Sequence, residues 1–134
     1  MRKTFNWYSY NIGIGNTTIL NRKYRDSNAP NSSSLGNDYP LYRYADLLLW
    51  YAELEGRVNK AATEKGVEAL NMTRRRAYGF KVNQSSPVDF KITDFASEQS
   101  FIDAVTKERG YETCYEAKRW MDLKRLGIVK QVIS

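Results

Sequence analysis

The sequence predicts an all-α fold with four main helices in two antiparallel pairs, preceded by an irregular arm rich in asparagine, serine and tyrosine. Apolar residues recur at helical spacing beyond residue 40, and capping residues stand at several expected helix ends. In the arm, the run NAPNSSS (28–34) is typical of loops, and only residues 4–10 and 17–20 favour short strands. We therefore divide the chain into an arm, 1–40, and a helical region, 41–134, which together form one domain.

The first helix is expected to start at residue 41. Its polar side chains are confined mainly to Arg43, Asp46 and Glu53, so it is apolar nearly all round. This pattern is typical of a central, buried helix. Glycine is common just past a helix end, and Gly56 is expected to end this helix.

Two further helices are predicted over residues 62–78 and 97–114. Gly79 stands just past the end of the second helix, and Ser97 is a suitable N-cap for the third. The segment that joins them contains Ser-Ser-Pro at residues 85–87, which indicates a long connection rather than a helix.

The fourth helix is predicted over residues 117–126, with Gly127 just past its end. Trp120 and Leu123 are expected to point inward, and Trp50 of the first helix is likewise expected in the core. Helices joined by a short loop are expected to pack antiparallel, and the long connection separates one such pair from the next, so the four helices form two antiparallel pairs.

The residue inventory excludes several classes of function. The 134 residues include no histidine and a single cysteine, Cys114. Catalysis by Ser-His-Asp or Cys-His groups is therefore excluded, as are histidine-built metal sites and an intramolecular disulfide. We expect no enzymatic activity, no metal and no cofactor.

Charged residues follow a regular pattern in the C-terminal part of the chain. Glu108, Glu112 and Glu116 are spaced by four residues, and Arg119, Asp122 and Arg125 by three, so each set shares one helix face. We predict a structural ion-pair network made of Arg43, Arg74, Arg76, Glu108, Glu112, Glu116, Arg119 and Asp122. The alternative is a paired-carboxylate active site at Glu108 and Glu112, but so many nearby arginines would keep both groups ionised.

Three motifs follow one another along the chain: RYADLLLWYAE (43–53), LNMTRRRA (70–77), and ERGYE (108–112) followed by YEAKRWMDLKRLG (115–127). In this order they resemble motifs of the SusD/RagB family of nutrient-binding surface lipoproteins. The resemblance implies a largely helical fold of TPR-like helix pairs. Family members are several times longer, so this chain resembles only their C-terminal part.

Four residues depart from the family pattern. Thr73 replaces an apolar residue and Gly110 an arginine; Thr113 stands in place of leucine and Ala117 in place of glycine. These departures are expected to weaken packing locally while the charged framework remains.

The resemblance also implies a function. Such a protein captures an oligosaccharide or another nutrient at the outer surface of the outer membrane, and hands it to a SusC-like TonB-dependent transporter. It makes and breaks no bond. The chain shows neither a signal peptide nor a lipidated N-terminal cysteine, so it is identified as a fragment of such a lipoprotein. A fragment of a larger core is expected to expose apolar surface and to self-associate.

Aromatic side chains in the arm are the candidates for contacting a sugar. Aromatic faces stack on pyranose rings, and polar neighbours orient the hydroxyl groups. The candidate ligand-binding residues are Trp7, Tyr8, Tyr10 and Tyr24. The alternative is that these rings pack the arm against the helices.

A second class of function is a basic helical module that binds nucleic acid, another anionic surface or a protein. Two observations favour it: the run of Arg74, Arg75 and Arg76, and the overall excess of basic residues, 21 against 15 acidic ones. The basic residues alternate with acidic ones rather than concentrating on one face, however, so we expect no nucleic-acid partner.

Overall fold

The protein is represented by a computed structural model that describes residues 7–11, 17–31 and 34–133, with side chains from residue 21 onward. The chain divides into two compact units, Met1–Leu41 and Tyr42–Ser134.

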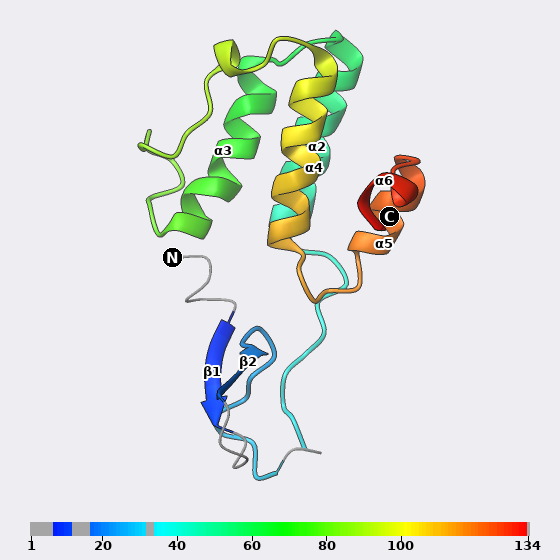
Figure 1. The fold of residues 1–134 in the computed structure, drawn as a ribbon. Coiled ribbons are helices and arrows are strands. Elements are labelled where there is room, and N and C mark those ends of the chain that lie inside the picture. The colour runs from blue at the N-terminus through cyan, green and yellow to red at the C-terminus, as the bar shows by residue number, and fades with distance from the viewer. Residues whose placement is uncertain (1–6, 12–16, 32–33, 134) are drawn as a thin grey trace. The chain divides into compact units, whose positions relative to one another are not determined.

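The first unit contains one antiparallel hairpin. Strand β1 (Trp7–Asn11) pairs with β2 (Thr17–Asn21), with Trp7 opposite Asn21 and Asn11 opposite Thr17 (Figure 1). These strands overlap the two segments for which the sequence favours strands. Beyond β2 the described chain has neither helix nor strand before residue 44.

The second unit is helical, and three of its helices lie side by side (Figure 1). Its elements are α2 (Tyr44–Asn59), α3 (Glu64–Tyr78), η1 (Ile92–Asp94), α4 (Glu98–Glu112), α5 (Arg119–Arg125) and α6 (Val129–Ile133). The predicted all-α class with four main helices is thus confirmed, and α6 is an addition that the sequence analysis does not include. None of the described helices combines the length and the apolar character needed to span a membrane.

Local capping explains where the helices start and stop. The hydroxyl of Thr63 accepts a hydrogen bond from the backbone N–H of Gly66 (3.0 Å) and caps α3. Gly79 ends that helix in the left-handed conformation, with φ at 82°. Ser97 caps α4 by accepting a bond from the N–H of Ser100 (3.2 Å).

The core lies between α2, α3 and α4. Leu49 of α2, Leu70 of α3 and Phe101 of α4 are all fully buried. Gly56 does not end the first helix as predicted, because α2 continues to Asn59. A Cβ atom at Gly56 would lie 2.7 Å from Cδ1 of Phe101, so this glycine instead allows α4 to approach α2 closely.

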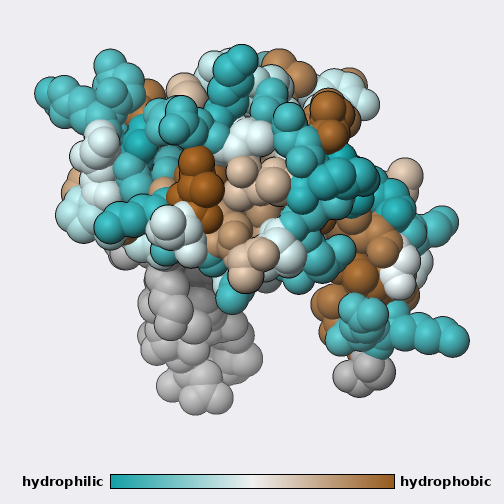
Figure 2. All heavy atoms as spheres, turned by 90° about the horizontal axis from the view of Figure 1, so that it is seen from above, coloured by the Kyte–Doolittle hydropathy of each residue, from teal (hydrophilic) through white to brown (hydrophobic). Residues whose placement is uncertain are grey.

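Two predictions about burial are wrong. The first helix is not buried all round, because Leu47 and Leu54, among others, are exposed. For the molecule in general, Figure 2 shows apolar side chains between hydrophilic ones on the face that it draws. Trp120 is 52% exposed instead of packed in the core. The buried arc of α5 contains Asp122 and Leu123, and the 100° step per residue places Trp120 at the flank of this arc.

Candidate functional site

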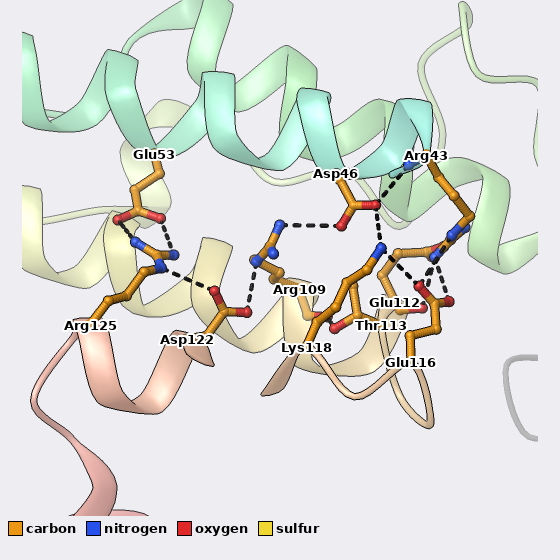
Figure 3. Close-up of polar contacts among 10 residues, drawn as sticks. All are labelled: Arg43, Asp46, Glu53, Arg109, Glu112, Thr113, Glu116, Lys118, Asp122 and Arg125. Carbon is orange, nitrogen blue, oxygen red and sulfur yellow. Dashed lines mark hydrogen bonds and ion pairs between the residues drawn. The ribbon is translucent and has the colours of Figure 1, made fainter. Parts of the chain in front are cut away.

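Helices α2, α4 and α5 are joined by a network of charged side chains, shown in Figure 3. Its members lie along the inner side of α2 and in the segment from the end of α4 through α5. They include Arg43, Asp46, Glu53, Arg109, Glu112, Glu116, Lys118, Asp122 and Arg125. Many are almost inaccessible to solvent, so their charges depend on one another for stabilisation.

Arg43, just before α2, ties that helix to the end of α4. Its Nη1 donates to Glu112 Oε1 (2.8 Å) and its Nη2 to Glu116 Oε1 (2.7 Å). Arg76 from α3 also pairs with Glu112. Three segments far apart in the sequence therefore meet at one carboxylate.

Asp46 occupies the first turn of α2 and receives three kinds of donor. Its carboxylate accepts from the backbone N–H of Arg43 (2.9 Å), from Lys118 Nζ (2.7 Å) and from Arg109 Nη1 (3.4 Å). Burial alone would raise the pKa of Asp46, but the bonds from Lys118 and from the Arg43 backbone outweigh it, so this pKa lies below its ordinary value.

Arg109 lies at the centre of the network. Its Nε donates to Asp122 Oδ2 of α5 (2.7 Å), while its Nη1 reaches Asp46 of α2. The guanidinium also lies over the ring of Trp50, 5.0 Å from the ring centroid, which adds a cation–π contact. A single buried cation thus holds three helices.

Arg125 and Glu53 form the far end of the network. Both terminal nitrogens of Arg125 donate to the two oxygens of Glu53 at 2.7 Å, a bidentate pair, and its Nε donates to Asp122 (3.0 Å). Burial would raise the pKa of Glu53, but hydrogen bonds from Arg125 and Arg57 hold it below its ordinary value.

A second cluster fixes the connection between α3 and α4. Arg75 is buried and forms bidentate contacts with Glu68 (2.7 and 2.9 Å) and with Asp89 (2.6 Å at the shortest), while Arg74 pairs with Glu108 (3.3 Å). Hydrogen bonds from the Arg75 guanidinium lower the pKa of Asp89 to about 2. The connection is therefore an anchored segment despite its lack of α-helix.

The lowered pKa of Asp89 predicts a pH dependence. Because this carboxyl titrates near 3.8 when unperturbed and at about 2 in the folded protein, the stability it contributes is present above pH 4 and is lost as the pH falls through 2. Asp89→Asn should therefore lower the unfolding free energy at pH 7, and the difference from the unmodified chain should shrink between pH 4 and pH 2. Urea titrations across this range test it. A constant difference would contradict the assignment.

The structure brings most of the predicted network residues into contact, but in three groups. Arg43, Arg76, Glu112 and Glu116 meet at the end of α4. Arg74 and Glu108 form a separate pair, and Asp122 pairs with Arg109 and Arg125.

Arg119 differs from this expectation. Among the described residues it forms no ion pair, and its Nη1 instead donates to the backbone oxygen of Thr106 (3.2 Å). The guanidinium lies close to Gly110, where a Cβ atom would be 3.1 Å from Nη1. The small residue that departs from the family pattern therefore provides the space in which Arg119 rests on α4.

The predicted set leaves out several members of the network. They are Asp46, Glu53, Arg109, Lys118 and Arg125, and the set also leaves out Arg75 of the second cluster. A signal was present for three of them: Asp46 and Glu53 are seven residues apart in a mainly apolar helix and so share one face, and Arg125 continues the three-residue spacing of Arg119 and Asp122.

The turn between α4 and α5 contains strained backbone. Tyr115 and Ala117 have φ of 64° and 55°, the left-handed region that L-residues with a Cβ atom disfavour. This conformation brings Glu116 and Lys118 back to the start of α2. The charged contacts therefore compensate a local backbone cost.

Ala117→Gly should relieve part of this strain. Removing the Cβ recovers about 1–2 kcal/mol of left-handed strain but increases the entropy of the unfolded chain, so we expect a net stabilisation of about 0.5 kcal/mol. Thermal unfolding should show a small rise in Tm. The control is Ala61→Gly at an exposed bend without positive φ, which should leave Tm unchanged or lower it. A lower Tm for Ala117→Gly would contradict the account.

The aromatic candidates lie in the first unit. The side chains of Trp7, Tyr8 and Tyr10 lie outside the described part of the structure, although their backbone belongs to β1. Tyr24 is half-buried and stacks on Tyr39, with ring centroids 5.9 Å apart and planes inclined by 18°. Their role in ligand binding stays a prediction.

Comparison with known proteins gives one consistent result. Residues 8–133 match the SusD family. SusD-like protein P2 of Formosa agariphila is 28% identical over 104 residues, which are 78% of this chain and 20% of that protein. A SusD homolog of Bacteroides thetaiotaomicron has a crystal structure that superimposes with a TM-score of 0.67 and 35% identity, over 82% of this chain and 20% of that one. The chain spans about one fifth of the length of both relatives. With a match over nearly all of its residues, a shared helical fold and 35% identity to a solved relative, the chain belongs to the SusD family.

Proposed function

We propose that this chain is part of a SusD-like protein that binds an oligosaccharide or another nutrient at the outer face of the outer membrane. The bound molecule is then passed to a SusC-like TonB-dependent transporter. The observation that carries the proposal is the family match over residues 8–133. Both relatives named above support it by sequence and by fold.

The described helical unit suits a scaffold for binding rather than a catalyst. Glu108, Glu112 and Glu116 each pair with at least one arginine, which favours their ionised form, so these carboxylates are poorly suited as proton donors to a substrate. Buried ion pairs of this kind hold helices in one arrangement, and a binding surface benefits from such pre-organisation.

The basic residues that favour a nucleic-acid module are used in the same way. Arg74, Arg75 and Arg76 each contact a carboxylate of the helical unit. Their charges are thus largely compensated within the protein, and we favour nutrient binding over binding of a polyanion.

We further propose that Trp7, Tyr8, Tyr10 and Tyr24 contribute sugar contacts. Tyr24 stacks on Tyr39, which covers one face of its ring, and we propose that an apolar pyranose face packs against the opposite face. Flanking asparagines and Arg22 provide hydrogen-bonding groups for hydroxyls.

Isothermal titration calorimetry of the 134-residue chain against a panel of neutral and acidic oligosaccharides tests this proposal. For a saccharide that binds, Tyr24→Ala should raise the Kd about tenfold, the effect of losing about 1.4 kcal/mol of stacking. Phe80→Ala is the matched control, since Phe80 is an exposed ring just past α3 and should not matter. No binding by the chain, or equal effects of both substitutions, would contradict the assignment of the arm.

A further inference from the structure

The connection between α3 and α4 runs beside α3 (Figure 1) and forms an open hollow with it. The volume of this hollow is about 570 Å³, and small-molecule sites commonly measure about 300–1,000 Å³. Residues of α3 line one wall, and residues 85–87 and 89–92 of the connection line the other. No residue drawn in Figure 3 lines it, so the hollow is separate from the charged network of α2, α4 and α5.

Hydrogen bonds hold both walls of the hollow together. The side-chain amide of Asn71 donates to the backbone oxygen of Phe90 (2.9 Å) and accepts from the backbone N–H of the same residue (2.8 Å). Arg75 pairs with Asp89 and also donates to the backbone oxygen of Val82 (2.8 Å). The walls are therefore fixed before a ligand enters, which lowers the entropic cost of binding.

Three of the charged residues that line the hollow already have partners. The guanidinium of Arg75 lies between the carboxylates of Glu68 and Asp89 and pairs with both. These groups satisfy one another and are not needed by a ligand. Two carboxylates around one guanidinium nevertheless leave an excess of one negative charge in the wall.

Glu64 and Lys91 also line the hollow, and neither forms an ion pair within the described part of the chain. Glu64 lies in the first turn of α3, and Lys91 directly follows the anchored residue Phe90. Together with the Arg75 cluster, the lining holds three carboxylates and two cations. The hollow thus presents one unpaired charge of each sign and is negative overall, which favours a ligand that carries an ammonium group.

The rest of the lining includes an apolar surface. Val67 is 5% exposed, Ile92 is 40% exposed and Phe90 is half-buried. Arg74 and Phe95 contact the ring of Phe90 as well, and the part that they leave uncovered lines the hollow. An apolar group of a ligand would remove some of this surface from water.

We propose that this hollow binds a free α-amino acid with an apolar side chain. The ammonium group pairs with Glu64, the carboxylate pairs with Lys91, and the side chain packs on Ile92 and Phe90. The site belongs to the helical unit, and the proposal does not rest on the sugar contacts proposed for the arm.

NMR titration of the isotope-labelled 134-residue chain with L-phenylalanine tests the site. We expect a Kd of about 1 mM, with the largest shifts at the backbone amides of Glu64, Phe90 and Lys91. Phenylalanine amide, which keeps the ammonium group alone, should bind about threefold more weakly. N-acetylphenylalanine, which keeps the carboxylate alone, should bind at least about tenfold more weakly, because the lining is negative overall.

Variants of the chain assign each charge to its partner. Glu64→Gln should weaken phenylalanine at least about tenfold and leave N-acetylphenylalanine unchanged. Lys91→Gln should weaken phenylalanine about threefold and leave the amide unchanged. Lys65→Gln is the matched control, since Lys65 adjoins Glu64 but does not line the hollow, and it should have no effect. The NMR spectrum of each variant also shows that it remains folded.

Three results would overturn the proposal. The first is a titration in which phenylalanine shifts none of the amides that line the hollow. The second is equal binding of phenylalanine and N-acetylphenylalanine, or equal effects of Glu64→Gln and Lys65→Gln. The third is maltose shifting these amides where phenylalanine does not, which would assign the hollow to a sugar.

Discussion

Arg109→Met is expected to lower the free energy of unfolding by about 3 kcal/mol, a fall in Tm of about 15 °C for a unit of this size. The side chain of Arg109 is only 5% exposed, and it connects Asp46 of α2 to Asp122 of α5. Without the guanidinium, both buried carboxylates lose a donor and cannot recover it from water. The value lies at the lower end of such effects because Lys118 and Arg125 remain as partners.

Arg57→Met is the matched control for this substitution. Arg57 also pairs with a carboxylate of α2, that of Glu53, but its side chain is 44% exposed and Glu53 keeps Arg125. Exposed pairs of this kind contribute about 0–1 kcal/mol. If urea unfolding shows that Arg109→Met and Arg57→Met lower the free energy of unfolding by similar amounts, burial of the ion pair makes no difference, and the result would contradict the stabilising role of the network.

Gly56→Ala is expected to destabilise the protein by about 1–2 kcal/mol, although alanine favours a helix by about 1 kcal/mol over glycine. The added Cβ would lie 2.7 Å from Phe101 Cδ1 and 3.1 Å from Ile102 Cδ1. Phe101 is fully buried and cannot move aside, so the overlap outweighs the helical preference.

Gly110→Ala provides the contrast. It is also a helical glycine, but its Cβ would meet only the flexible end of Arg119. We expect this variant to be neutral or slightly stabilising by thermal unfolding. The double variant Gly56→Ala, Phe101→Leu should recover part of the loss caused by Gly56→Ala. Stabilisation by Gly56→Ala alone would contradict the close packing of α2 and α4.

The helices were predictable where local signals agree with tertiary packing. Thr63, Ser97 and Gly79 lie at helix ends in the structure, and the last two were predicted there from the sequence. Gly56 misled the prediction because glycine serves both as a helix end and as a point of close approach. Nothing local distinguishes the two, since the decisive neighbour, Phe101, lies 45 residues away in the sequence.

The charged network was predictable as a pattern but not as a set of pairs. Periodic spacing shows which residues share a helix face, yet the partner across the interface depends on how two helices are set against each other. Arg119 and Arg109 illustrate this: Arg119 was predicted in the network but contacts a backbone oxygen, whereas Arg109 was missed and lies at the centre.

The spacing of apolar residues also did not predict which side chains are exposed to solvent. A helix that is apolar all round has no polar face from which to infer its orientation, so the exposed side of α2 could not be separated from its core side. Trp120 was assigned to the core because it lies inside a helix motif, but α5 is only seven residues long and buries a narrow arc.

The central claim is that buried guanidinium–carboxylate pairs join α5 to α4 and α2 in the helical unit. A double-mutant cycle on Arg109→Met and Asp122→Leu, measured by urea unfolding, tests it most directly because it isolates the interaction between these two side chains. We predict a coupling free energy of about 2 kcal/mol. The double variant should therefore lose about 2 kcal/mol less unfolding free energy than the two single variants lose together. Additive losses, with a coupling below about 0.5 kcal/mol, would contradict the claim.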